Sequence, residues 1–146
     1  PYTVGFALSK VDTSSVLFFL GILLAIGALE SFGYLNSLAV FLENTLGNQY
    51  LIVTIIGLAS SVVDNVPLVA ATMGMYNLAD FPLDHAMWEY LAFCAGTGGS
   101  ILIIGSAAGV AVMGMEKIEF IWYAKKIGIL ALLGYFVGAA TYLLLV

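Results

Sequence analysis

A short polar run inside an apolar stretch is the part of this sequence best suited to chemistry. Ser60, Ser61, Asp64 and Asn65 supply two hydroxyls, a carboxylate and a carboxamide shortly before Pro67. An ionisable side chain in such apolar surroundings is costly and usually functional. All four side chains can offer oxygen atoms, which small hard cations such as sodium prefer as ligands. The run therefore predicts a cation site in which Asp64 is the charged ligand of sodium.

The same residues have a structural alternative. Asp64 or Asn65 can cap a helix that begins here, and Pro67 suits the first turn of that helix. Asn65 alone could form the cap, so capping does not explain a charge at this position. The hydroxyls of Ser60 and Ser61 can bind the cation, their own helical turn or a neighbouring helix. For the two serines these interpretations stay open.

A second candidate segment, residues 95–100, is rich in glycine and contains Thr97 and Ser100. Its three glycines are expected to interrupt a helix and to free backbone carbonyls, which is how many transporters build sites at mid-membrane. Helical rise from Trp88 sets this segment at a depth similar to that of the first one. We therefore expect the two segments to face each other, with Thr97 and Ser100 as further ligands of the cation.

Three other side chains could take part in chemistry: those of Glu30, His85 and Cys94. Glu30, near the end of the first apolar stretch, can either reach the lipid headgroups or line an ion path. His85 is the single histidine and is expected in a solvated loop, so it cannot serve an intramembrane serine hydrolase. The glycines near Thr97 are not followed by the lysine of a phosphate-binding loop. Cys94 is the single cysteine, which excludes a disulfide within the chain.

Composition determines what must surround these residues. Of the 146 residues, 62% are hydrophobic and 9% are charged, whereas a soluble domain carries about a quarter charged residues. The chain is therefore expected to be an all-α integral membrane protein whose main partner is lipid. Net charge is −5 and arginine is absent, so nucleic acid is excluded as a partner.

Hydropathy divides residues 1–146 into the elements of a single membrane domain. The segments with mixed polarity are expected to lie along the membrane surface. The predicted order is a span at 14–35, an interfacial segment at 38–49, a re-entrant hairpin at 51–78, a broken span at 88–113, an interfacial segment at 115–126 and a span at 127–146.

The re-entrant hairpin is predicted from length. Asp64, Asn65 and Pro67 divide the second apolar stretch into two limbs of a dozen or so residues, each about 20 Å long as a helix. Neither limb can cross a bilayer core of about 30 Å, so we expect the chain to dip to mid-membrane and return. This arrangement buries the polar tip inside the protein.

Orientation follows from the lysines. With residues 14–35 and 88–113 as crossing spans, Lys10, Lys117, Lys125 and Lys126 all fall on one side of the membrane. Because positive residues are enriched in cytoplasmic loops, that side is predicted to be cytoplasmic.

Three runs of the sequence carry a resemblance to a known family. They are SSVVDNVPLVAATMGMY at residues 60–76, LFFLGILLAIGALES at 17–31 and GTGGSILIIGSAAGVAVMGMEK at 96–117. Together they resemble the second, C-terminal half of NhaD-type sodium/proton antiporters, within the superfamily of ion transporters that also holds arsenite and dicarboxylate carriers.

The resemblance implies an inverted-repeat transporter of which this chain is one half. It implies a bacterial inner membrane or an organelle membrane, and as partners the N-terminal half of the transporter and a second copy in a homodimer. No resident cofactor is expected, because sodium or lithium and the proton are the transported species.

An ionised carboxylate in an apolar site is costly, so a proton or sodium should neutralise Asp64, and competition between the two would produce exchange.

Two other functions were weighed against exchange. An anion carrier of the same superfamily would transport arsenite-like or dicarboxylate-like substrates, but the fixed charge of Asp64 would repel an anion unless it were neutralised. A non-transporting assembly subunit would use the polar tip only as a helix cap. In neither case is the protein an enzyme.

Overall fold

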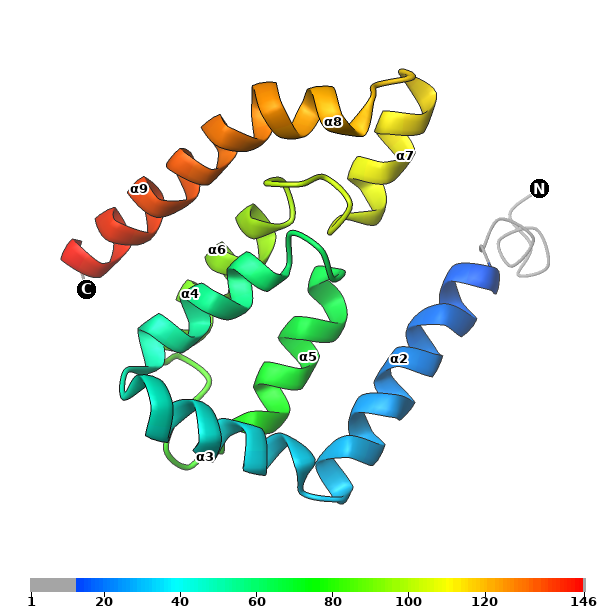
Figure 1. Ribbon diagram of the computed structural model, residues 1–146. Coiled ribbons are helices and arrows are strands. Elements are labelled where there is room, and N and C mark those ends of the chain that lie inside the picture. Colours follow the sequence, from blue (N-terminus) through cyan, green and yellow to red (C-terminus); the bar gives the residue numbers. More distant parts are fainter. Residues whose placement is uncertain (1–12, 146) are drawn as a thin grey trace, which may run out of the picture.

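The computed structural model describes residues 13–145, so Lys10 lies outside the described residues. All regular elements in this range are helices, as predicted from the sequence (Figure 1). They are α2 (Thr13–Ser31), α3 (Tyr34–Leu46), α4 (Gln49–Ala59), α5 (Asn65–Met75), α6 (Ala86–Gly98), α7 (Ala107–Met115), α8 (Phe120–Tyr123), a π-helical turn (Ala124–Gly128) and α9 (Ile129–Leu145).

A sharp bend separates α2 from α3. Within the predicted span at 14–35, helix α2 ends at Ser31. Helices α2 and α3 meet at an angle of 74°. Gly33 has a φ of 74°, a left-handed conformation that glycine adopts without the steric cost of a side chain. The predicted interfacial segment at 38–49 falls largely within α3, which runs across the lower end of the molecule in Figure 1.

Helices α4 and α5 occupy the predicted hairpin. Asn48 begins α4, because its side-chain oxygen accepts a hydrogen bond from the backbone N–H of Leu51 at 3.1 Å. Each helix has 11 residues, a length of about 16 Å. Residues 60–64 join them in a turn, from which the two helices diverge in Figure 1.

Helices α6 and α7 cover the predicted broken span, and residues 99–106 between them are not helical. His85 caps α6, since its Nδ1 accepts a hydrogen bond from the N–H of Met87 at 3.1 Å. This half-buried histidine is therefore a structural residue at a helix start and not the solvated loop residue that was expected. Ser106 caps α7 by accepting a hydrogen bond from Gly109 at 3.3 Å.

The last helix is longer than the apolar stretch at 127–146. It runs without a break from Phe120 to Leu145, through the π-helical turn, so that residues 120–126 continue into α9. Among the described residues it is the one unbent helix long and apolar enough to cross a membrane. The bent pair formed by Leu23–Ser31 and Tyr34–Leu46 would be a second if both parts count as one span.

The core lies where α4 packs against α6 and α6 packs against α9. Tyr90 and Tyr135 are fully buried there, and both bind Thr54 of α4. The hydroxyls of Tyr90 and Thr54 are 2.7 Å apart, and the Tyr135 hydroxyl donates to the Thr54 carbonyl at 2.6 Å. Helices α2 and α9 expose many large apolar side chains, among them Leu17, Leu23, Leu24, Leu130, Leu133 and Val137.

Candidate functional site

Asp64 is the first of the predicted site residues and stands at the start of α5. Its Oδ1 accepts a hydrogen bond from the N–H of Val66 at 2.9 Å, which makes Asp64 the N-cap of the helix. Pro67 lies in the first turn, where a missing N–H breaks no helical hydrogen bond. The capping alternative therefore applies to Asp64 rather than to Asn65. Both residues are half-buried, and Oδ2 of Asp64 takes no part in the capping bond.

The two serines of the turn are buried. Ser60 is fully enclosed, and its hydroxyl donates to the carbonyl of Ala95 in α6 at 2.8 Å. Of the three interpretations that the sequence left open, the structure shows the hydrogen bond from Ser60 to a neighbouring helix. Its hydroxyl oxygen keeps lone pairs that a cation could use. Ser61 is 8% exposed and lies beside it.

The turn at 60–64 packs against the connection at 99–106 through backbone atoms. A methyl group added to Gly105 would overlap the carbonyl oxygen of Ser60. Just beside this contact, where α6 meets α4, a methyl group added to Gly98 would overlap the carbonyl oxygen of Gly57. Only glycine allows two backbones to approach so closely. These contacts agree with the expectation that the two segments meet, and they gather polar backbone groups in one region.

Thr97 and Ser100 direct their hydroxyls to their own backbone. The Thr97 hydroxyl donates to the carbonyl of Phe93 at 2.6 Å, and the Ser100 hydroxyl donates to the carbonyl of Thr97 at 2.7 Å. Tyr123 donates to the Ser100 carbonyl at 2.7 Å and so ties the last helix to this segment. Tyr123 was not predicted as a site residue, because its only local signal was an aromatic residue among lysines.

A shallow pocket of about 310 Å³ opens beside Ser100. Ser106, Tyr123 and Ile103 line it as well. Ile103 has a φ of 61°, which is rare and strained for a β-branched residue. Among the hydrogen bonds of the described residues, none joins Asp64 to Thr97 or Ser100. The structure therefore brings the two serines of the turn to residues 99–106 but leaves the carboxylate unlinked to the other predicted ligands.

Glu30 lies at the other end of α5 from Asp64. Its carboxylate is near Gly74, since a Cβ atom built on that glycine would be 3.5 Å from Oε2 of Glu30. The side chain is exposed and lines an open pocket of about 400 Å³.

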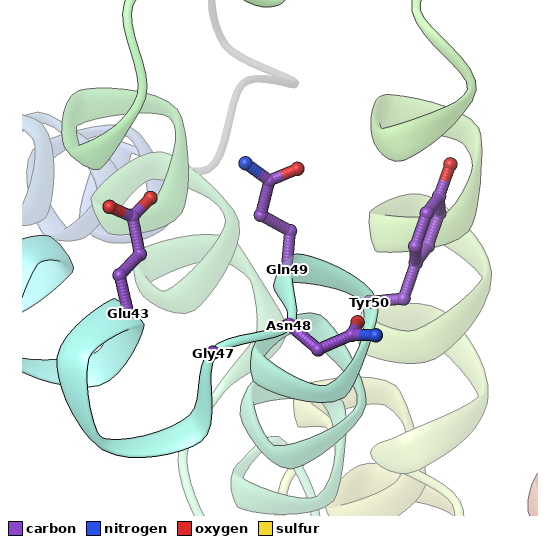
Figure 2. Close-up of a pocket in the computed structure, with 5 residues that line it drawn as sticks. All are labelled: Glu43, Gly47, Asn48, Gln49 and Tyr50. Atoms are coloured by element: carbon purple, nitrogen blue, oxygen red, sulfur yellow. The ribbon is translucent and has the colours of Figure 1, made fainter.

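A further polar pocket of about 440 Å³ lies at the turn between α3 and α4. Figure 2 shows Glu43, Gln49 and Tyr50 extending their side chains toward the same side of this turn. Gly47 makes the turn with a φ of 64°, and Asn48 uses its oxygen to cap α4. None of these residues was predicted as a site residue, because their grouping depends on the fold of the turn.

The chain is similar to known transporter proteins over most of its length. The model of one protein family, described as citrate transporter (CitMHS), matches residues 3–90. Sodium/proton antiporter 1 of Arabidopsis thaliana is 56% identical over 137 residues, which are 94% of this chain and 24% of that protein. The Na(+)/H(+) antiporter NhaD of Vibrio cholerae is 37% identical over 99% of this chain and 30% of its own length.

The comparisons also show how much of such a protein the chain represents. It spans about a quarter to a third of the length of these relatives. A Mycobacterium tuberculosis protein named an uncharacterized transporter is 31% identical over 75% of the chain. No solved structure matches the chain.

Proposed function

We propose that this chain, which belongs to the citrate transporter (CitMHS) family, forms the second repeat of a transporter that exchanges sodium or lithium for protons. The chain is a segment of a secondary transporter in a membrane and not an enzyme. Because it spans only part of its relatives, the activity would belong to the longer protein. The N-terminal half of that protein would be its partner, and two copies would form a dimer.

One observation carries the proposal. The sequence is similar throughout to proteins named sodium/proton antiporters, and its apolar stretch at 49–75 contains a single carboxylate, Asp64, at a helix turn. Oxygen atoms of Ser60, Ser61 and Asn65 lie in or next to the same turn. The backbone of residues 99–106 approaches this turn closely at Gly105.

The exchange mechanism follows from the cost of an ionised carboxylate away from water. A proton or a sodium ion can neutralise Asp64, but both use the same oxygen atoms. When one binds the other must leave, so the two movements are coupled. The lone pairs of Ser60, Thr97 and Ser100 would supply neutral ligands to sodium, and the missing half of the transporter would enclose the ion.

The arrangement in the membrane is also part of the proposal. Helices α4 and α5, at about 16 Å each, are too short to cross a core of about 30 Å, which supports a re-entrant hairpin. Helices α6 and α7 would form one broken span around residues 99–106. Lys117, Lys125 and Lys126 would face the cytoplasm, across a bacterial inner membrane or an organelle membrane.

The description of the family names citrate, so an anion carrier is the second candidate. The negative charge of Asp64 disfavours it, because an anion would be repelled at the turn. The third candidate, an assembly subunit, gains support from the capping bond of Asp64. Sodium should raise the thermal stability of a transporter, whereas a helix cap alone gains nothing from the ion.

The test of the proposal is Asp64→Asn in the full-length protein, reconstituted in vesicles. Asparagine caps helices about as well as aspartate, so this variant should fold. We expect sodium-driven proton movement to be abolished, since the charge that both ions neutralise is gone. Asp80→Asn removes an exposed carboxylate from the loop after α5 and should leave exchange unchanged. Normal exchange in Asp64→Asn would reject the assignment.

A further inference from the structure

The carboxyl end of α5 faces a carboxylate of another helix. Helix α2 packs against α5, and Gly74 lets the Glu30 carboxylate approach the last turn of α5. The open pocket between them is polar as well as accessible. It is lined by Glu30, Asn36, Gly74, Tyr76 and Asn77, together with three apolar residues.

This arrangement is electrostatically unfavourable without a positive partner. The last four carbonyls of a helix have no partner within it, and they carry a partial negative charge. A carboxylate at this end is destabilised, whereas a cation is stabilised. The last turn of α5 has no basic residue, and among the described residues Glu30 forms no ion pair. Two negative groups therefore face each other across an open pocket.

Oxygen atoms from several sources surround the same space. Asn36 and Asn77 bring carboxamides, of which the Asn77 oxygen accepts one hydrogen bond from Ala79 and keeps a second lone pair. Tyr76 also lines the pocket and is only 6% exposed, but the charge that acts on its hydroxyl, unpartnered among the described residues, is that of Glu43 in α3 and not that of Glu30.

We propose that Glu30 and the carboxyl end of α5 bind a monovalent hard cation, sodium or lithium, at a second site. A single carboxylate with neutral oxygens matches one positive charge, while protein sites for divalent cations usually contain more carboxylates. The site lies about 16 Å from Asp64, the length of α5. Its role as a station on the ion path to Asp64 rests on the proposed function.

The test measures binding and transport separately, in the full-length protein. The melting temperature in detergent is compared between sodium chloride and choline chloride, in the Asp64→Asn background. Sodium should still raise the melting temperature, by about 1–3 °C, through the second site. Adding Glu30→Gln should remove this rise. Adding Asp80→Asn instead, which removes an exposed carboxylate from the loop after α5, should leave it intact.

Each outcome decides one question. A sodium effect that survives Glu30→Gln, or is absent already in Asp64→Asn, overturns the second site. A larger effect of calcium than of sodium overturns the assignment to monovalent cations. If the unsubstituted protein shows no exchange but keeps the Glu30-dependent rise in melting temperature, the proposed function is overturned and the second site is retained.

A transport measurement covers the case in which Asp64→Asn does not fold. Glu30→Gln alone should raise the sodium concentration for half-maximal exchange about tenfold, the effect of about 1.4 kcal/mol, with little change in maximal rate. Asp80→Asn should leave that concentration unchanged. Equal values for Glu30→Gln and the unsubstituted protein would overturn the second site.

Discussion

The two ends of α5 give a carboxylate opposite electrostatic environments. At the amino end, Asp64 accepts a hydrogen bond from the helix itself, and the adjoining turn is packed backbone to backbone against residues 99–106. At the carboxyl end, Glu30 comes from another helix, meets no basic side chain of the described residues and borders an open pocket. Figure 1 shows the amino end of α5 in the middle of the molecule and its carboxyl end beside α3 at the lower end.

The end of a helix that a carboxylate faces determines whether the carboxylate still lacks a partner for its negative charge. Free N–H groups at an amino end stabilise negative charge, so Asp64 is partly satisfied before any ion arrives. Free carbonyls at a carboxyl end oppose negative charge, so Glu30 depends more on a cation. We therefore expect substitutions in the packed turn beside the amino end to lower stability most, and those at the carboxyl end to act mainly on ion binding.

The largest effect is expected from Gly98→Ala. The new methyl group would overlap the carbonyl oxygen of Gly57 and come within 2.8 Å of the Ser60 hydroxyl, so two helices would have to separate. Backbone atoms cannot yield as a flexible side chain can, and overpacking of this kind costs about 1–3 kcal/mol or more. We expect little folded protein by size-exclusion chromatography in detergent.

Gly96→Ala is the matched control for this substitution. Gly96 lies in the same helix, two residues earlier, with nothing within 4 Å of its added methyl group. It should be neutral or slightly stabilising, because alanine favours a helix more than glycine does. If both variants fold equally well, the amino end of α5 is not rigidly packed, and the contrast between the two ends fails.

The sequence reveals local features of this packed end better than distant ones. The run from Asp64 to Pro67 predicts a helix start, because capping and the restricted proline backbone act within one turn. Glycines at residues 96–99 indicate where α6 stops, since their effect on a helix is also local. Which of Asp64 and Asn65 would cap could not be decided, because both residue types make good caps.

Contacts between distant segments could not be predicted. Thr54 binds Tyr90 and Tyr135, which lie 36 and 81 residues away in the sequence, and no local pattern links them. The position of Glu30 against Gly74 likewise depends on how α2 crosses α5. The bend at Gly33 was missed because glycine is common in membrane helices and rarely marks a turn there.

Ser60→Ala should have the next largest effect. It removes the hydrogen bond to the Ala95 carbonyl and leaves that buried carbonyl with one partner fewer. The expected loss of stability is about 1–2 kcal/mol, seen as a lower melting temperature in detergent. Ser37→Ala is the control, because the exposed Ser37 hydroxyl bonds only to its own turn and should change stability little. Equal melting temperatures would show that the turn is held by the glycine contacts alone.

A smaller effect separates the two roles of Asp64. Asp64→Ala should lower the stability of the sodium-free protein by about 1 kcal/mol, because the cap to Val66 is lost. Asp64→Asn should lower the stability of the sodium-free protein by only a few tenths of 1 kcal/mol, about the spread between good caps, because the amide oxygen can also cap the helix. Both variants should lack exchange. If stability and exchange fell in parallel across the two variants, Asp64 would serve as a cap only.

The smallest change in stability is expected at the carboxyl end, for Gly74→Ala. The added methyl group would meet Leu35 Cδ1 at 2.8 Å and Glu30 Oε2 at 3.5 Å, both at the ends of flexible side chains. The gain in helix propensity, about 0.5–1 kcal/mol, should roughly offset that crowding.

Gly74→Ala nevertheless moves the Glu30 carboxylate away from the carbonyls of α5. Sodium exchange in vesicles should therefore need a higher sodium concentration for half-maximal rate, although the melting temperature in choline chloride stays within about 2 °C of the original. Gly114→Ala is the control, because nothing lies within 4 Å of its added methyl group and it is remote in sequence from both α2 and α5. A large loss of stability in Gly74→Ala would mean that the carboxyl end is packed as tightly as the amino end. An unchanged sodium dependence would mean that the close approach of Glu30 to α5 has no part in ion binding.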